Sequence, residues 1–381
     1  MLTLTDAIFV NQPYKGNAKL KYSLLSGKTG FTPHRSQGIF RHLMQFKNEQ
    51  IPFPLLIGDI GGTNARFQIL VNPDTKPIRF PNLLTANHST LENAIQSGIL
   101  DHTEVKPHAA IIAAAGPIEN GRLDLTNYNW SIRPENFLGN LSIKDLILLN
   151  DFEAQALATT SFEAADIIKI GAGEPVANAS RVIIGPGTGL GVAGLIHGYD
   201  NWIPVPGEGG HVSMGPQTDE DFSIWPFLEK ECNRVSAEQL VSGRGILNIY
   251  RAVSARENRD ATLTTPEQIT AAALDGRDKL ATNSVELFCG YLGRIAGDMA
   301  LTFLARGGVY IAGGIGKQIT PIMSKSRFRR EFEIKFPHSE LLRSIPTYLI
   351  VHENAALSGL ASFARSQNEF GLNTKGRRWR T

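Results

Sequence analysis

Cysteine is scarce in this chain, and its scarcity argues against two classes of protein. The 381 residues contain two cysteines, Cys232 and Cys289, which are far apart and belong to no C-x-x-C pair. A small secreted scaffold needs an even, closely spaced set of cysteines, and a structural zinc site needs a cluster of them. The chain therefore fits a reducing compartment, and we expect it to be cytoplasmic.

Long apolar runs are missing as well. The longest runs, such as 109–116, fall well short of the roughly 20 residues that a membrane-spanning helix requires. The chain does not open with a basic segment followed by an apolar one, so we expect neither a secretory signal nor a membrane partner. Residues 1–43 loosely resemble an organellar transit segment. Because Met44 shortly precedes the first strand, we favour an extension before the true start, or an added segment.

Neither sign of charge dominates the whole chain, but charge is unevenly distributed. The formal net charge is +2, with +5 in residues 1–50 and +4 in residues 365–381, which leaves −7 for residues 51–364. A nucleic-acid reader carries a basic patch on its fold, and an acidic body with basic ends does not fit that class. We expect no nucleic-acid partner, and we interpret both basic ends as solvated.

The most informative segment that is present is LIGDIGGTNARF, residues 56–67. An apolar strand ends near Asp59, a Gly-Gly-Thr-Asn turn follows at 61–64, and the chain returns as an apolar strand. Glycines allow backbone N–H groups to approach an anion closely. A carboxylate beside them would repel a bare phosphate, so a divalent cation between the two makes sense. The segment predicts a hairpin that holds metal-bound phosphate.

A second glycine-rich turn, 185–191, is also flanked by apolar strands. It contains a formal G-x-G-x-x-G at Gly189, Gly191 and Gly194, but a strand follows instead of the helix that a dinucleotide-binding fold requires. We therefore interpret it as a second phosphate cradle that faces the first. The simpler alternative, a tight hairpin turn that needs glycine, fits either turn alone better than both together.

Strands and helices alternate along the chain, which predicts an α/β fold with mixed sheets, because the first connection is a hairpin. We expect strands within 56–71, 108–115, 143–149, 181–197, 309–312 and 347–351, and helices at 89–98, 152–160, 220–231, 236–256, 266–275, 278–305 and 354–365. Ser89 and Ser236 are the expected caps of two of these helices. Because the strand–turn–strand pattern occurs twice, we predict two similar α/β units around a cleft.

The expected domain organisation follows from this repetition. We predict an N-terminal extension at 1–50, a small domain at 51–160, a large domain at 161–351 and a basic tail at 371–381. The C-terminal helix, at about 352–370, is expected to complete the small domain.

Asn150 and Asp151 follow a predicted strand and open a helix, a place where polar side chains face a cleft. A carboxylate there can accept a proton from a substrate hydroxyl while the neighbouring amide holds the substrate, as phosphoryl transfer requires. The residues leave open the alternative that Asp151 only caps the helix.

Two further segments suit a sugar. Glu208 and His211 lie three apart among residues that cannot form regular structure, which suits binding to adjacent hydroxyls. A surface loop is the alternative for this pair, and a zinc site is a poorer one, because two ligands without a nearby cysteine are too few. Glu238 is expected near a helix start, where a carboxylate is favourable in any case.

The segment 312–315 joins a strand to a predicted helix through two glycines. Such a junction can accept the flat face of a nucleotide base. The alternative is a close-packed strand–helix junction that needs small residues.

Six segments together resemble the bacterial-type glucokinase family, part of the sugar kinase/actin/Hsp70 superfamily. They are GDIGGTNAR (58–66), LLNDFEAQALA (148–158), GPGTGLGVA (185–193), PGEGGHV (206–212), VSAEQLVSG (235–243) and YIAGGIG (310–316). The resemblance spans about residues 55–365 and implies two ribonuclease-H-like domains around a central cleft. It further implies an ATP:D-glucose 6-phosphotransferase that acts in glycolysis with ATP and Mg²⁺.

The resemblance also implies a role for each matching residue. Asp151 would be the catalytic base, and the sugar would be bound by Asn150, Asp151, Glu208, His211 and Glu238. The ATP phosphates would be held by Gly58, Asp59, Ile60, Gly61, Gly62, Thr63, Asn64, Gly187, Thr188 and Gly189, and the adenosine by Gly313, Gly314 and Ile315. Asp59 would contact Mg²⁺, directly or through water.

Two alternatives stay open beside this interpretation. One is a kinase for another hexose or for an amino sugar. The other is a non-catalytic, actin-like nucleotide-binding protein. The expected partners are ATP and a small sugar, and a homodimer is one option for the oligomeric state.

Overall fold

The computed structural model describes residues 50–116, 118–119, 121–125 and 128–381. Apart from Gln50, the N-terminal extension predicted for 1–50 lies outside the described residues. The described residues pack together as one body, and the division at residue 160 into a small and a large domain stays a prediction.

The first sheet has the strand order β16-β9-β5-β1-β2-β3, with β4 also paired to β2. Its strands are β1 (Leu55–Ile60), β2 (Asn64–Leu70), β3 (Ile78–Arg79), β4 (Leu83–Leu84), β5 (Ala109–Ala114), β9 (Asp145–Asn150) and β16 (Arg378–Arg380). The β1–β2 pair is antiparallel, whereas β1, β5 and β9 are parallel. Strand β5 is buried along its whole length, as is typical of a parallel strand covered on both faces.

The second sheet repeats this order as β10-β15-β14-β11-β12-β13. Its strands are β10 (Ile167–Ile170), β11 (Arg181–Pro186), β12 (Leu190–Gly198), β13 (Asn201–Gly207), β14 (Val309–Ile311) and β15 (Thr347–Ile350). In both sheets, two successive antiparallel pairings are followed by two parallel ones, and an antiparallel strand covers the parallel edge. The prediction of two similar α/β units is confirmed. A small third sheet consists of β6 (Ile118–Glu119), β7 (Arg122–Asp124) and β8 (Ser131–Ile132).

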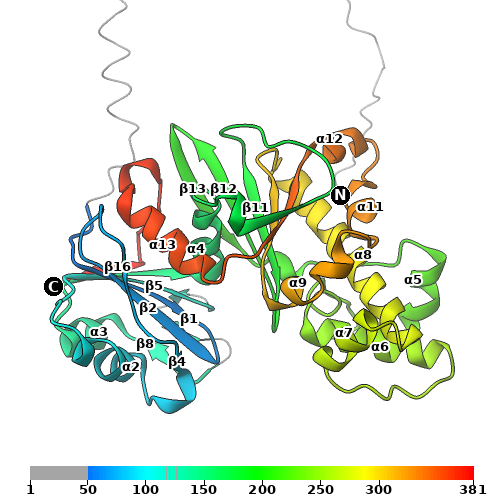
Figure 1. Ribbon diagram of the computed structural model, residues 1–381, viewed down its shortest axis with the longest axis horizontal. Coiled ribbons are helices and arrows are strands. Elements are labelled where there is room, and N and C mark those ends of the chain that lie inside the picture. Colours follow the sequence, from blue (N-terminus) through cyan, green and yellow to red (C-terminus); the bar gives the residue numbers. More distant parts are fainter. Residues whose placement is uncertain (1–49, 117, 120, 126–127) are drawn as a thin grey trace, which may run out of the picture. The chain divides into compact units, whose positions relative to one another are not determined.

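Two helices, α4 (Asp151–Ala158) and α13 (Ala355–Arg365), are buried between the sheets. They lie side by side (Figure 1), and a Cβ on Gly359 of α13 would come within 1.9 Å of the Ala154 carbonyl oxygen of α4. Their apolar cluster includes Ile57 of the first sheet and Ile183 of the second. One shared core therefore joins both sheets to the helix that begins at Asp151.

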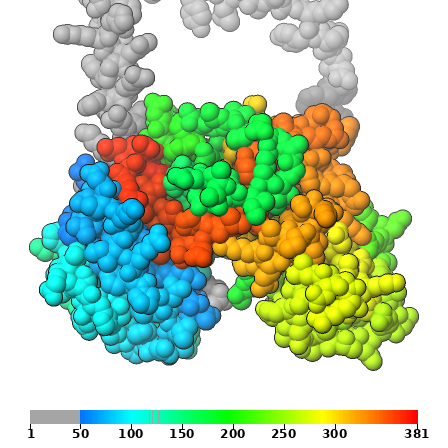
Figure 2. Space-filling model, in the orientation of Figure 1, coloured from blue at the N-terminus to red at the C-terminus, as the bar shows by residue number. Residues whose placement is uncertain are grey.

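The other helices cover the outer faces. They are α2 (Leu91–Gly98) and α3 (Pro134–Leu141) on the first sheet, and α5 (Asp219–Ile224), α6 (Gly243–Arg256), α7 (Pro266–Leu274), α8 (Lys279–Thr302), α9 (Gly314–Gln318), α10 (Thr320–Met323), α11 (Phe328–Glu333) and α12 (Ser339–Ser344) around the second. Figure 2 shows the surface hollowed between the blue part, which holds the first sheet, and the yellow part, which holds α6 to α8.

Several predicted helix bounds are wrong, each for a local reason. Thr90, not Ser89, caps α2 by accepting a hydrogen bond from the Asn93 N–H. The helix predicted at 220–231 ends at Ile224, because a proline stands two residues further on. The helix predicted at 236–256 begins only at Gly243, with Ser242 as its cap.

The basic tail is not solvated as predicted. Residues Arg378–Arg380 form β16, which pairs antiparallel with β9 at the edge of the first sheet. Arg378 also donates to the buried carboxylate of Asp145 at 2.6 Å. The positive charges at this end are therefore used to hold the chain terminus on the sheet.

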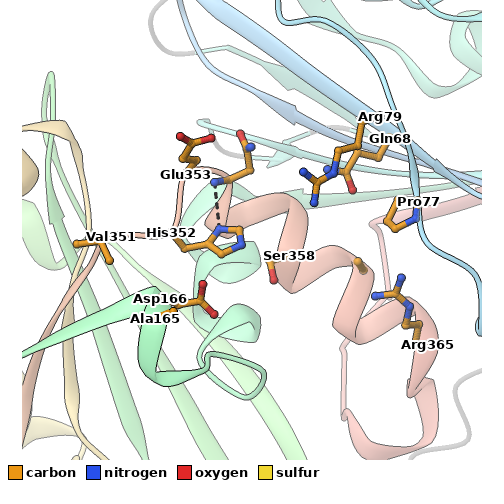
Figure 3. A pocket seen from close by; sticks show the side chains of 12 residues that line it. Gln68, Pro77, Arg79, Ala165, Asp166, Val351, His352, Glu353, Ser358 and Arg365 are labelled. Carbon is orange, nitrogen blue, oxygen red and sulfur yellow. Dashed lines mark hydrogen bonds between the residues drawn. The ribbon is translucent and has the colours of Figure 1, made fainter.

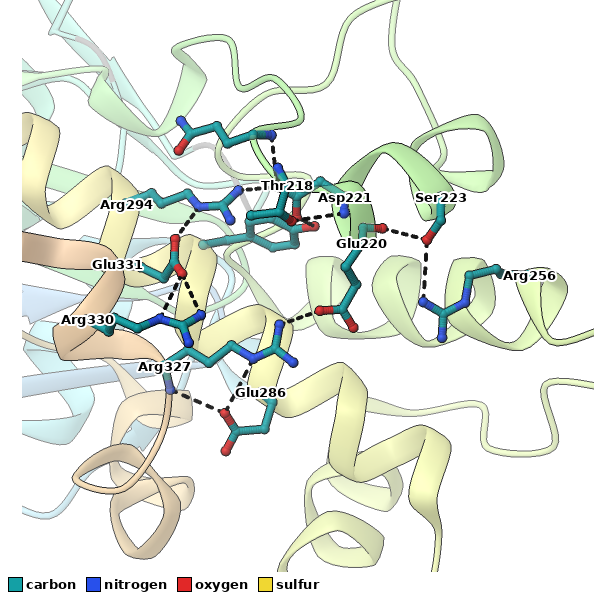
Figure 4. Close-up of polar contacts among 12 residues, drawn as sticks. Thr218, Glu220, Asp221, Ser223, Arg256, Glu286, Arg294, Arg327, Arg330 and Glu331 are labelled. Carbon is teal, nitrogen blue, oxygen red and sulfur yellow. Dashed lines mark hydrogen bonds and ion pairs between the residues drawn. The ribbon is translucent and has the colours of Figure 1, made fainter. Parts of the chain in front are cut away.

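A buried ion cluster fixes the helices behind the second sheet (Figure 4). The Arg294 guanidinium on α8 lies 2.6 Å from Asp221 on α5 and 2.8 Å from Glu331 on α11, and these side chains are at most 7% exposed. Burial would raise the pKa of the Asp221 carboxyl, but hydrogen bonds from the Gln217 N–H, Arg294 and Tyr291 outweigh it and hold that pKa below its usual range.

We predict that Asp221→Asn lowers the free energy of unfolding by about 3–5 kcal/mol at pH 7, because it leaves a buried arginine with one counter-charge fewer. The matched control is Asp219→Asn on the same helix, an exposed residue whose loss should cost at most about 1 kcal/mol. Urea unfolding measures both. Since the folded-state pKa of Asp221 lies below the unfolded value of about 3.9, its stabilisation is complete above that pH and is lost as the pH falls through the folded pKa. A difference between wild type and Asp221→Asn that stays constant from pH 7 to pH 2 would contradict this account.

Candidate functional site

Three carboxylates from different elements converge. Asp59 lies near the end of β1, Asp151 opens α4 directly after β9, and Glu208 follows β13. The parallel strands β1 and β9 end at the same edge of their sheet, which brings their last side chains together. Burial, together with the negative charges of Asp59 and, less strongly, Glu208, raises the pKa of the Asp151 carboxyl to about 6. Asp59 and Glu208 are thus both close enough to Asp151 to act on its charge.

Asp59 has a cross-strand partner that the sequence reasoning missed. Arg66 stands opposite it in the β1–β2 register, and its Nη1 lies 3.2 Å from Asp59 Oδ2. Burial raises the pKa of the Asp59 carboxyl, and the Arg66 guanidinium opposes that rise. The sequence could have indicated this pair, because a tight hairpin turn over 61–64 fixes which residues of the two strands face each other.

The first glycine turn is pinned from outside the hairpin. Thr85, also missed in the sequence, donates its hydroxyl to the Gly62 carbonyl at 2.7 Å and its N–H to the Thr63 carbonyl at 3.1 Å. The Gly61 N–H is donated within the turn to the Asn64 carbonyl at 2.9 Å. Of this turn, Thr63 is the residue whose side chain is exposed.

Gly58 and Ile60, in the first motif, are packed within the core. A Cβ on Gly58 would come within 2.8 Å of Ile112 and 2.9 Å of Phe67, and Ile60 is 1% exposed within the core. Their predicted part in holding phosphate can therefore come only from the main chain.

The second glycine hairpin lies directly against the first turn of α4. A Cβ on Gly191 would come within 1.9 Å of the Phe152 ring, and one on Gly185 within 2.7 Å of it. These two glycines are needed for the close approach of strands to helix. A Cβ on Gly187 would meet nothing within 4 Å, so the tip of the turn is open. Contact through Phe152 holds that hairpin beside Asp151.

Glu238 lies beneath the tip of the second hairpin. Its carboxylate accepts a hydrogen bond from the Leu190 N–H at 2.9 Å, and its own N–H donates to the Gly210 carbonyl at 2.8 Å. It stands in a turn that precedes α6, not in the helix predicted there. The Gly187 N–H donates to the Gly189 carbonyl at 2.8 Å, which leaves Thr188 and Gly189 as the residues of the tip that can offer N–H groups to a ligand.

Glu208 and His211 remain open to solvent. The Glu208 Oε2 and His211 Nε2 atoms lie 3.8 Å apart, with side chains that are 83% and 55% exposed. Their loop is nevertheless held in place, because a Cβ on Gly210 would come within 2.0 Å of the Leu190 carbonyl oxygen. The pair is therefore presented by a fixed loop and is free to bind a polar ligand.

The 313–315 junction combines both roles that the sequence left open. Gly313 has a φ of +87°, and a Cβ there would come within 2.2 Å of the Pro186 carbonyl oxygen, so close packing requires glycine. A Cβ on Gly314 would meet nothing within 4 Å. Ile315 is 8% exposed and belongs to the core, so only its main chain is open to a nucleotide.

The donor set of the site fits a substrate-bound Mg²⁺. In the described part of the chain, no three His, Cys, Asp or Glu residues form a group that could hold a metal ion on their own. Mg²⁺ is typically held by one or two carboxylates together with substrate phosphates. Asp59 and Asp151, which repel each other, offer such a pair, and a cation would relieve their repulsion.

A separate cavity of about 420 Å³ lies where β15 runs into α13 (Figure 3). His352, Asp166, Arg79 and Arg365 are among its lining residues, and none of the predicted site residues lines it. The described residues also contain no helix that is both long and apolar enough to span a bilayer.

Comparison with known proteins agrees with the geometry. The family model described as Glucokinase matches residues 56–367. The glucokinase of Rhizobium meliloti (strain 1021) is 53% identical over 329 residues, which is 86% of this chain and 97% of that relative. The glucokinase of Mesorhizobium japonicum (strain LMG 29417 / CECT 9101 / MAFF 303099) is 49% identical, over 86% of this chain and 96% of its own length.

Solved structures have the same fold. A glucokinase from an Antarctic psychrotroph superposes with a TM-score of 0.75 at 32% identity and covers 83% of this chain and 100% of its own. A ROK family glucokinase from Streptomyces griseus, solved with glucose and AMPPNP, has a TM-score of 0.55 at 20% identity over 82% of this chain and 99% of its own. The expected fold of two ribonuclease-H-like units is confirmed, and the chain belongs to the glucokinase family.

Proposed function

We propose that this protein transfers the γ-phosphoryl group of ATP to the 6-hydroxyl of D-glucose, giving glucose 6-phosphate for glycolysis. The observation that carries the proposal is the Asp151 carboxyl, which lies near Asp59 of the first hairpin and next to the residue that contacts the second. Phosphoryl transfer depends on positioning and on charge neutralisation, and two glycine hairpins beside one carboxylate suit both needs.

Asp151 would act as the base. Its carboxylate accepts the proton of the attacking hydroxyl, and a pKa of about 6 places the group close to neutral pH, where a general base is effective. The N–H of Phe152 donates to Asp151 Oδ1 at 3.0 Å, which orients the carboxylate. Asn150, whose side-chain oxygen caps the same helix, would use its amide NH₂ on the sugar.

The remaining sugar hydroxyls would be bound by Glu208, His211 and Glu238. The first two offer an exposed carboxylate and imidazole on a fixed loop. Glu238 already accepts the Leu190 N–H with Oε2, so its Oε1 is the atom that we assign to the sugar. One carboxylate would then contact both the sugar and the second glycine hairpin.

The nucleotide would be held by the main chain around the two turns. Thr63, Asn64, Thr188 and Gly189 are proposed to bind the phosphates, and Gly313 and Gly314 to bind the adenosine. Asp59 would hold Mg²⁺, directly or through water, and the bound ion would neutralise charge on the phosphates during transfer.

The proposal extends to the cellular context. Both cysteines are unpaired, Cys232 at the surface and Cys289 in the core, as expected for a cytoplasmic protein.

The proposed domain organisation assigns the base to the small domain, 51–160, and Glu208, His211 and Glu238 to the large domain, 161–351. Size-exclusion chromatography with light scattering would distinguish a monomer from the homodimer that the sequence left open.

We predict that Asp151→Asn reduces kcat with glucose by about 10²- to 10⁴-fold, because the amide cannot accept the proton. Glucose and ATP should still bind in calorimetry, since the amide keeps the shape of the carboxyl. Coupled detection of ADP with glucose, fructose and an amino sugar measures the rate and tests the choice of substrate in one assay.

A near-wild-type rate for the variant would refute the assignment of Asp151 as the base, and a higher kcat/KM for another sugar would refute the assignment of glucose as the substrate. ATP-dependent polymerisation without sugar phosphorylation would instead favour the actin-like alternative.

The pH dependence follows from the same group. Asp151 must be ionised to act as a base, so kcat/KM for glucose should fall as the pH decreases through about 6, the value to which burial and neighbouring charge raise its pKa. The residual rate of Asp151→Asn should show no such decline. An inflection near pH 4 in the wild type would mean that the carboxyl is not perturbed.

We also predict that Gly191→Ala lowers both stability and kcat, because the added Cβ would lie 1.9 Å from the Phe152 ring and displace the first turn of α4. Overpacking of this kind typically costs about 1–3 kcal/mol in urea unfolding. Gly198→Ala on the same strand is the control, since its Cβ would meet nothing within 4 Å. Adding Phe152→Leu to Gly191→Ala should recover part of the loss, and failure to do so would exclude the ring contact as its cause.

A further inference from the structure

The C-terminal tail reaches the candidate catalytic turn. Strand β16 pairs with β9 from Arg380 opposite Asp145 to Arg378 opposite Ile147. One residue further on, the Leu148 N–H donates to the Arg377 carbonyl at 2.9 Å. Gly376, with a φ of +71°, turns the chain into this position. The tail therefore begins beside the end of β9 that leads into Asn150 and Asp151, where the candidate base lies, and runs from there to Asp145.

The side chain of Arg377 extends this contact to Glu153. Its Nη1 donates to Glu153 Oε2 at 2.7 Å, and the Glu153 side chain is only 1% exposed. A charged group is rarely buried to this extent without a partner, because desolvation costs several kcal/mol. The other oxygen, Glu153 Oε1, has no hydrogen-bond partner among the described residues. Arg377 is the cation that makes burial of this carboxylate tolerable.

Glu153 also stabilises the turn that contains the candidate base, Asp151. The oxygen that accepts from Arg377 also accepts the Asn150 N–H at 3.1 Å. Asn150 Oδ1 accepts the Phe152 N–H at 2.9 Å, which completes a reciprocal cap around Asp151. If Arg377 is lost, the buried carboxylate has no cation beside it and rotates toward water, which weakens its hold on Asn150.

We propose that Arg377 is a positioning residue for phosphoryl transfer, which acts through Glu153 to fix the Asn150–Asp151 turn. This inference rests on the proposed function, because it assumes that Asp151 is the base. It assigns a role in catalysis to the tail that lies beyond the six sequence motifs. A misplacement of about 1 Å at a reacting group can cost about 10²-fold in rate, so a contact of this kind is sufficient to matter.

The tail offers its own matched control in Arg380. This arginine also pairs with a buried carboxylate, but its partner is Asp145 of β9, at the end of that strand opposite to Asn150. Asn150 stands five positions after Asp145, or roughly 17 Å along an extended chain. Arg377→Ala and Arg380→Ala thus remove the same type of side chain from the same segment, and only the first touches the catalytic turn.

The test compares these variants in the full-length protein. Arg377→Ala should lower kcat by about 10- to 100-fold, with KM for the sugar and for ATP within about twofold of wild type, because the geometry of transfer is affected more than ground-state binding. Arg380→Ala should keep kcat within about twofold at a similar change in melting temperature. Arg377→Lys should restore part of the rate, since an ammonium can still pair with Glu153.

A second-site variant separates positioning from simple docking of the tail. Glu153→Gln removes the buried charge but keeps an oxygen that can accept the Asn150 N–H, so it should raise kcat when it is added to Arg377→Ala. If Arg377 only docks β16, Glu153→Gln will lower kcat by the same factor in both backgrounds. That result, or equal losses for Arg377→Ala and Arg380→Ala, overturns the inference.

Failure of this inference can be told apart from failure of the proposed function. If wild type forms no ADP with any sugar of the panel, both fail together. If wild type is active and Arg377→Ala matches it, only the positioning role fails.

Discussion

The contact between Phe152 and two glycines is the constraint on which the candidate site depends. Phe152 follows Asp151 in α4, and its ring occupies the space that side chains would take at Gly185 and Gly191. The helix belongs to the chain that leaves the first sheet, whereas the glycines belong to the second. A single aromatic side chain therefore sets the separation between Asp151 and the second glycine turn, which are distant in sequence. The rest of α4 lies with α13 in the shared core beside that contact.

Electrostatics adds a second constraint, because the site gathers negative charge in a partly buried place. Burial raises the pKa of both the Asp59 and the Asp151 carboxyls, the charge of Asp59 raises that of Asp151 further, and Arg66 opposes the rise at Asp59. Such an arrangement is unfavourable for the empty protein and favourable for one that receives a cation with its phosphates. Structural clusters behave differently, as Asp221 shows, since its carboxyl is neutralised by Arg294 within the fold. Asp221 thus belongs to the scaffold, whereas Asp59 and Asp151 belong to the proposed site.

Much of the site could be predicted from the sequence, because glycine turns and strand-end carboxylates are local signals. Both hairpins and the position of Asp151 at the start of a helix followed from short motifs, and the two α/β units followed from the repetition of the hairpin pattern. The ribonuclease-H-like fold followed from the resemblance to a known family. Features that depend on distant contacts could not be predicted. The segment around Glu238 forms a turn because residues 237 and 238 donate their N–H groups to the carbonyls of Val212 and Gly210. No feature of the sequence near Glu238 indicates these hydrogen bonds. Similarly, the sequence does not say which glycines meet Phe152 and which face open space.

The two sheets differ in how their parallel edges are covered, and this bears on solubility. β10, an internal segment, covers β15, whereas the last residues of the chain cover β9. An uncovered strand as apolar as β9 would offer unpaired main-chain groups to another molecule, a common start of aggregation. The covering strand is only three residues long and reads Arg-Trp-Arg, a short and charged sequence on which further strands add poorly. Residues Arg378–Arg380 thus also protect the sheet from pairing with another copy of the chain.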